Sequence, residues 1–261
     1  MTIRQGLMVC GTVPDSEAFS FAAEHGFDFV ELDMEQAFPA QDIDTTSLRE
    51  TLVAHDLDVV VHLPYRLYPG SPHDHVRKGA CRQLEFAIDT AVELGAEKGV
   101  FHAASGGFPH VWGHEALRES LYESVRRLTT YGRERDFEVC LENVKRDFFT
   151  CSDFSNLFEE TDAVSCLDTG HAYATGHDAE TQASLFRTHG DRISHLHLND
   201  TRRDDDDEHL PVGFGKVDFD VLTAAMRETN WKGTCTHELF SFHIEYAGHG
   251  KSAFDRLLSP E

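Results

Sequence analysis

Short apolar runs alternate with longer amphipathic segments along most of the chain, which has 261 residues. Strand–helix alternation predicts a parallel sheet, because parallel neighbours need a crossover helix. Eight such units in this length predict a single (β/α)8 barrel. An open doubly wound sheet is the alternative, but no Gly-rich phosphate loop follows the first strand. The predicted strands begin near Gly6, Phe27, Asp58, Gly99, Phe137, Ala163, Ile193 and Thr234.

Four amphipathic segments between these runs predict helices, at 16–25, 76–94, 114–131 and 217–229. The segment 76–94 has its apolar residues on one face, and Gly95 is placed to end it. Asp15, after Pro14, is the expected N-cap of the first helix. No linker or low-complexity segment interrupts the pattern, so we expect one domain over residues 1–261.

Six of the apolar runs end in a side chain that can bind a metal ion. Burying unpaired imidazoles or carboxylates costs several kcal/mol each, and a shared cation is the simplest compensation. In a barrel the carboxyl ends of all strands converge on one face, where active sites lie. The residues are His62, His102, Glu142, Asp168, His197 and Glu238.

The last four of these form the predicted metal site, since three carboxylates and one imidazole suit Mn, Mg, Co or Zn. Salt-bridged core carboxylates are the alternative, but the strand ends offer almost no basic partners. We expect His62 and His102, on the same rim, to contact a metal or the substrate. A buried histidine with a structural role remains the simpler alternative for each.

Further candidates lie just beyond the strands or within them. His171 follows the sixth strand, and Asp207 with His209 forms an Asp-x-His pair that can chelate one ion. Asp207 also belongs to an acidic run, so a solvated loop is its alternative. We favour a structural role for His195, while Glu31 could point into the barrel or toward a helix.

Weaker candidates lie in the loops. Trp112 could form an apolar wall for a sugar ring or pack within its loop. Arg66, Arg202 and Arg203 could hold a phosphate, although ordinary surface arginine is the simpler interpretation.

The formal net charge is −23, with 46 acidic and 23 basic residues. A lysine-poor acidic surface favours a high-salt cytoplasm over a basic partner, and it disfavours nucleic acid as a partner. No run approaches the ~20 apolar residues that span a bilayer, and no signal pattern opens the chain, so we expect a cytoplasmic protein without membrane contact.

The six cysteines form no CxxC pair. The sequence predicts that Cys10, Cys140, Cys166 and Cys235 lie in strands as small buried hydrophobes.

Together these motifs resemble the xylose-isomerase-like TIM barrels, the superfamily of sugar isomerases and epimerases that also contains endonuclease IV. The resemblance runs from about residue 27 to 240, and it implies that Glu142, Asp168, His197 and Glu238 are metal ligands. The motifs are His62-Leu63-Pro64-Tyr65, Phe101-His102, Leu141-Glu142-Asn143, Leu167-Asp168-Thr169-Gly170-His171, His197-Leu198-Asn199-Asp200, His209-Leu210-Pro211-Val212-Gly213-Phe214-Gly215 and His237-Glu238.

All nine residues that hold three zinc ions in endonuclease IV have counterparts here. The resemblance implies a first ion on His62, His102 and Glu142, and a second on Glu142, Asp168, His197 and Glu238. It implies a third ion on His171, Asp207 and His209. Departures weigh against a role in DNA repair: the opening 7–11 differs from that of endonuclease IV, and the loop before His209 is shorter.

Two enzymatic hypotheses follow. The first is a metal-dependent isomerase or epimerase of a small sugar or sugar phosphate, in which Glu142 and Glu238 transfer the proton and His171 or His62 relays or orients. The second is a phosphoesterase with three zinc ions. A metal-dependent structural or sensor protein is a third class. Barrels of this type often dimerise, so a homodimer is an open alternative.

Overall fold

Eight parallel strands form a closed barrel in the order β1 to β8. The computed structural model describes residues 3–145, 147–240 and 243–259. The (β/α)8 prediction is confirmed, and each strand begins within two residues of the expected position. The strands are β1 (Arg4–Val9), β2 (Phe29–Asp33), β3 (Asp58–His62), β4 (Lys98–His102), β5 (Glu138–Glu142), β6 (Val164–Asp168), β7 (Ile193–Leu198) and β8 (Thr234–His237).

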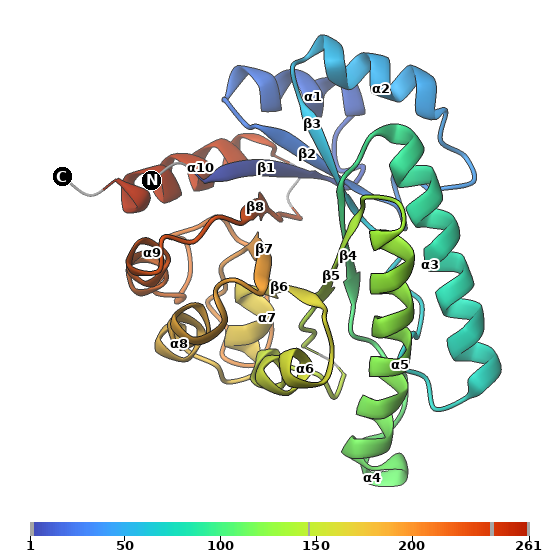
Figure 1. The fold of residues 1–261 in the computed structure, drawn as a ribbon. Helices are drawn as coiled ribbons and strands as arrows, with labels where there is room; N and C mark the ends of the chain where they lie inside the picture. Colours follow the sequence, from blue (N-terminus) through green and yellow to red (C-terminus); the bar gives the residue numbers. More distant parts are fainter. Residues whose placement is uncertain (1–2, 146, 241–242, 260–261) are drawn as a thin grey trace.

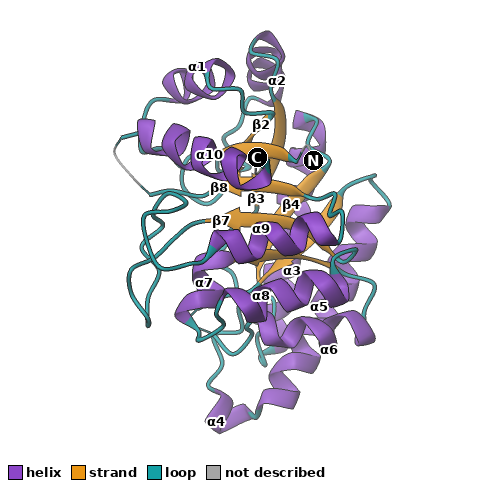
Figure 2. Cartoon of the chain, turned by 90° about the vertical axis from the view of Figure 1, so that its left-hand side faces the viewer, coloured by secondary structure: helices purple, strands orange, loops and turns teal. Residues whose placement is uncertain are grey.

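Helices surround the strands, as Figures 1 and 2 show from two directions. The long helices α3 and α5 lie side by side, and all four helices predicted from the sequence are present. They are α1 (Asp15–Glu24), α2 (Thr45–Ala54), α3 (Asp74–Leu94), α4 (Pro109–Trp112), α5 (His114–Arg133), the 3-10 helix η1 (Cys151–Asp153), α6 (Phe154–Glu160), α7 (Thr169–Ala174), α8 (Ala179–His189), α9 (Phe219–Glu228) and α10 (Glu245–Leu258).

Two local predictions about helix ends had different outcomes. Gly95 ends α3 with a φ of 98°, a left-handed conformation that favours glycine. The prediction that Asp15 caps α1 was wrong, because the cap is Pro14 and Asp15 is the first helical residue. The Pro14 carbonyl accepts hydrogen bonds from the backbone N–H groups of Glu17 and Ala18, so the helix begins one residue earlier than predicted.

The strand register brings the polar strand ends to one edge of the barrel. His102 lies opposite Glu142, and Asp168 lies opposite His197, in the parallel pairing of neighbouring strands. Apolar side chains fill the space between the strands and the surrounding helices. The barrel therefore acts as a frame that holds side chains from distant parts of the sequence together.

The predicted positions of the cysteines are confirmed for three of the four. Cys140, Cys166 and Cys235 are buried within strands. Cys10 is only partly buried and lies directly after β1, so its prediction as a strand residue was wrong.

Among the described residues, no helix is long and apolar enough to cross a membrane.

Candidate functional site

Four side chains meet at the carboxyl end of the barrel. Glu142 and Asp168 end β5 and β6, His197 is the penultimate residue of β7, and Glu238 directly follows β8. One ligand atom from each lies within 4.8 Å of the others. The Nδ1 of His197 is 3.4 Å from Glu142 Oε1 and 3.4 Å from Glu238 Oε2. The grouping predicted from the strand ends is thus present in space.

Several atoms at this centre are buried without a hydrogen-bond partner among the described residues. They are Glu142 Oε1, His197 Nδ1 and Glu238 Oε2. Leaving such groups unsatisfied in the interior is costly. A divalent cation would satisfy all three, and the oxygen-rich donor set suits a hard or borderline ion. The residues present therefore fit a metal centre.

The two glutamates differ in acidity. Burial raises the pKa of Glu142, but the charges of His102 and His197 outweigh it, so the pKa lies well below the usual value. Burial raises the pKa of Glu238 well above the usual value, and the neighbouring carboxylates add to that effect. A cation would favour the ionised form of both groups.

His62 and His102 lie beside this centre, as the sequence predicted. The Nε2 atom of each ring is 3.3 Å from Glu142 Oε2. His62, His102 and Glu142 form a second group of converging ligand atoms. Glu142 therefore belongs to both groups, with Oε1 near His197 and Oε2 near His62 and His102. The ring of Tyr65 lies 5.3 Å from that of His102, at the outer side of the pair.

The third predicted group also gathers here. His171 Nε2 is 3.4 Å from Asp207 Oδ2, and His209 Nδ1 is 2.8 Å from the same oxygen. His171 Nδ1 lies 3.2 Å from Glu142 Oε1, which joins this group to the central one. Burial, aided by the charges of His171 and Lys145, lowers the pKa of His209 to about 3. All nine residues predicted as ligands therefore lie at one end of the barrel.

Sequence reasoning missed Lys145. It follows Glu142 by three residues, and its Nζ lies 2.7 Å from Asp206 Oδ1 and contacts Asp207. A single lysine in a loop has no pattern that distinguishes it from a surface residue.

Glu31 lies next to the central group. The sequence left open whether its side chain points into the barrel or toward a helix. It points into the barrel, where Oε1 is 3.1 Å from His197 Nε2 and Oε2 is 3.1 Å from His195 Nε2. Burial raises the pKa of Glu31, but the two histidines outweigh it, so the pKa is well below its usual value. An ionised carboxylate only accepts hydrogen bonds, so both Nε2 atoms carry protons.

This contact orients His197 for metal binding. With Nε2 protonated and held by Glu31, Nδ1 is the atom that faces Glu142 and Glu238. Carboxylates that fix the second nitrogen of a ligating imidazole are common behind metal sites.

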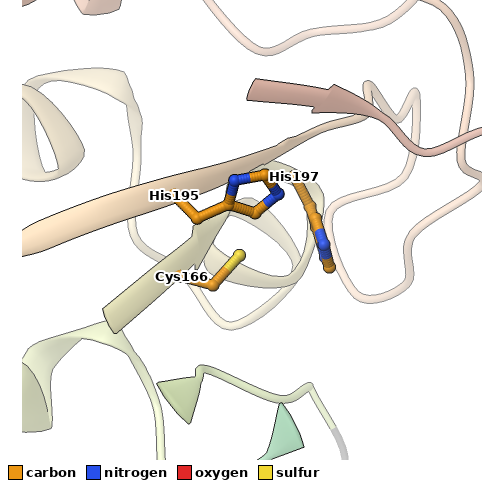
Figure 3. Close-up of side chains that lie close together, drawn as sticks. All are labelled: Cys166, His195 and His197. Atoms are coloured by element: carbon orange, nitrogen blue, oxygen red, sulfur yellow. The ribbon is translucent and has the colours of Figure 1, made fainter. Parts of the chain in front are cut away.

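A different trio, Cys166, His195 and His197, also has converging ligand atoms. Figure 3 shows the Cys166 side chain beside the two imidazoles of β7. Both Nε2 atoms are already bound to Glu31. Burial raises the pKa of Cys166 well above its usual value, so the thiol keeps its proton. Cys166 and His195 therefore pack behind His197, in line with the structural role expected for His195.

The opposite end of the barrel contains a hollow of about 650 Å³. Several of its charged residues form ion pairs: Arg4 pairs with Asp58, and Lys98 Nζ is 3.2 Å from Glu138 Oε1. The unpartnered ligand atoms are at the carboxyl end, which is where we place the site.

The loop candidates make contacts typical of surface residues. Arg202 pairs with Glu208, and Arg203 lies 3.7 Å from Asp205. Trp112 lies in the short helix α4 rather than a loop, with its ring 5.3 Å from that of His73.

Comparison with known proteins agrees with this architecture. The family model described as xylose isomerase-like TIM barrel matches residues 19–257. Proteins named as epimerases and as probable endonucleases are among the relatives of this barrel. The protein belongs to the xylose isomerase-like TIM barrel family.

Relatives within the family differ in their named activities. Fructoselysine 3-epimerase of Escherichia coli O157:H7 is 25% identical, over 99% of this chain and 99% of its own length. A probable endonuclease 4 of Mycobacterium ulcerans is 30% identical, over 67% of this chain and 71% of its own. A D-tagatose 3-epimerase-like protein has the same fold, with a TM-score of 0.82 at 23% identity, covering 98% of this chain and 97% of that one.

Proposed function

We propose that the protein is a divalent-metal-dependent isomerase or epimerase of a small sugar or sugar phosphate. The observation that carries the proposal is the convergence of Glu142, Asp168, His197 and Glu238, whose buried ligand atoms lack hydrogen-bond partners in the part of the chain that the structure describes. The fructoselysine 3-epimerase, which aligns over almost the whole chain, supports the same class of reaction.

The chemistry requires a proton to leave and return at a carbon beside a carbonyl. A divalent cation, when bound, supplies polarisation of the carbonyl and of the neighbouring hydroxyl. Glu142 ends β5 and Glu238 follows β8, and each has an oxygen 3.4 Å from His197 Nδ1. One carboxylate removes the proton from one face of the substrate, and the other returns a proton to the opposite face.

Other residues would position the substrate and exclude water. His62 and His171 each lie beside Glu142 and can orient a hydroxyl or relay a proton. Tyr65, beside His102, offers an apolar surface at the outer side of the site.

The test is product analysis after incubation of the metal-loaded protein with a panel of ketoses, inososes and keto-sugar phosphates. We expect one class to be converted, and both Glu142→Gln and Glu238→Gln to lose about 10²- to 10⁴-fold in rate. Glu97→Gln, an exposed position at the other end of the barrel, is the matched control. Metal content is measured for every variant. Wild-type protein that binds metal but converts none of the panel would contradict the proposal.

A phosphoesterase of the endonuclease IV type is the second candidate. The gathering of all nine ligand counterparts and the probable endonuclease 4 relative favour it. It requires three zinc ions and cleavage of abasic-site DNA or a small phosphodiester. The net charge of −23 and the acid-paired rim arginines oppose DNA binding.

A further inference from the structure

The loop after β5 places a positive charge inside the third ligand group. The Lys145 ammonium lies 2.7 Å from Asp206 Oδ1 and against the carboxylate of Asp207. The Asp207 side chain is fully buried and that of Lys145 is one-fifth exposed. A lysine in this position is shielded from water and has its charge balanced by two aspartates.

Asp207 lies among these charged neighbours, and neither of its buried oxygens has a hydrogen-bond partner among the described residues. One carboxylate oxygen faces Lys145, and the other is 2.8 Å from His209 Nδ1 and 3.4 Å from His171 Nε2. Asp168, His171 and His209 converge within 4.8 Å. Asp207 joins none of the converging groups found among the described residues, although it lies beside two of their members.

A divalent ion on Asp207 would have to share this carboxylate with the ammonium. The two cations would then lie a few ångströms apart in a buried site, where screening by solvent is weak and like charges repel strongly. The ion would also have to separate Lys145 from Asp207, which would leave the partly buried lysine with Asp206 as its remaining acidic partner among the described residues.

We infer that Lys145 is a built-in cation that takes the place of a third metal ion, so that the site binds at most two. One would lie on Glu142, Asp168, His197 and Glu238, and the other on His62, His102 and Glu142. This inference does not require the protein to be an epimerase. A site that binds at most two ions differs from that of phosphoesterases that need three.

The test is the number of zinc ions bound per chain. Metal-free protein is loaded with Zn²⁺, freed of excess ion, and measured by elemental analysis beside its own variants. We expect at most two ions for the wild type and for Lys145→Arg, which keeps the charge. Lys145→Met should bind one ion more, and adding His209→Ala to it should remove that ion. Lys216→Met is the matched control, because it removes an exposed lysine from Asp204 in the same region.

A second measurement does not depend on any variant folding. Anomalous scattering from crystals of the zinc-loaded wild type should place ions at the carboxylate centre, and none within bonding distance of Asp207 and His209. An ion at that position, or three ions per wild-type chain, would overturn the inference, and so would a Lys145→Met variant that folds but gains no ion. These readings do not involve turnover, so they stand whether or not a sugar substrate is found.

Discussion

Replacing Glu31 by glutamine should weaken metal binding although Glu31 is not a proposed ligand. In the native protein its carboxylate accepts hydrogen bonds from His195, His197 and Thr236. The bond from His197 Nε2 fixes that proton and so leaves Nδ1 to face the centre. Glutamine keeps the shape but not the charge, and its amide group would point a donor at one of the two imidazoles.

The magnitude follows from the single hydrogen bond that orients a ligand. A hydrogen bond to a charged acceptor contributes about 1.5–3 kcal/mol. Each tenfold change in affinity corresponds to ~1.4 kcal/mol. We therefore expect Glu31→Gln to lower metal affinity by about 10- to 100-fold, as for other residues behind metal ligands.

The assay is competitive titration of Mn²⁺ or Zn²⁺ against a chelating indicator, with circular dichroism to establish that the variant is folded. Glu35→Gln is the matched control, because Glu35 lies just beyond the same strand and accepts a hydrogen bond from the Arg66 backbone instead. Wild-type metal affinity in a folded Glu31→Gln protein would refute the reasoning.

Three further outcomes are expected. Burial lowers the pKa of His237 from 6.5 to about 3, so the unfolded chain binds more protons than the native one as the pH falls. The free energy of unfolding should therefore decrease by about 1.3 kcal/mol between pH ~7.5 and ~5.5. Urea unfolding at both pH values should show a smaller decrease for His237→Asn than for the wild type. Gly170→Ala should lower the free energy of unfolding by about 1–3 kcal/mol in denaturant titrations, because its Cβ would lie 1.8 Å from Asn199 Oδ1. Gly79→Ala is the control, because its Cβ would lie 3.9 Å from the Arg82 side chain, an ordinary contact. A chelator should lower the melting temperature of metal-loaded protein, since ions that bind only the native state stabilise it. Equal melting temperatures with and without the chelator would count against a metal centre in the native state.

The fold was predictable because strand–helix alternation is a repeated, local signal. Each strand begins within two residues of its expected position, and the barrel then places strand ends together without further information. The ligand candidates were predictable for the same reason: Glu142 and Asp168 end strands whose carboxyl ends share one face. Position along a strand is enough to predict this convergence.

What the sequence did not reveal depends on side-chain direction and on loop paths. The sequence does not show whether the Glu31 side chain points into the barrel or toward a helix, whereas the structure places it in contact with His197. Lys145 reaches Asp207 only because the loops after β5 and β7 run together, and no periodicity encodes that approach. The cap of α1 differed by one residue because the prediction weighed the Asp15 side chain and not the Pro14 carbonyl, which accepts the first hydrogen bonds of the helix.

Proton exchange at the substrate carbon tests the central proposal most directly. Metal-loaded protein is incubated in heavy water with the ketose or inosose that it converts, and the carbon beside the carbonyl is followed by nuclear magnetic resonance. The proposal predicts that deuterium enters at that carbon together with inversion, and that Glu142→Gln and Glu238→Gln abolish both. Inversion without deuterium, or full exchange in both variants with metal still bound, would contradict proton transfer by these two carboxylates.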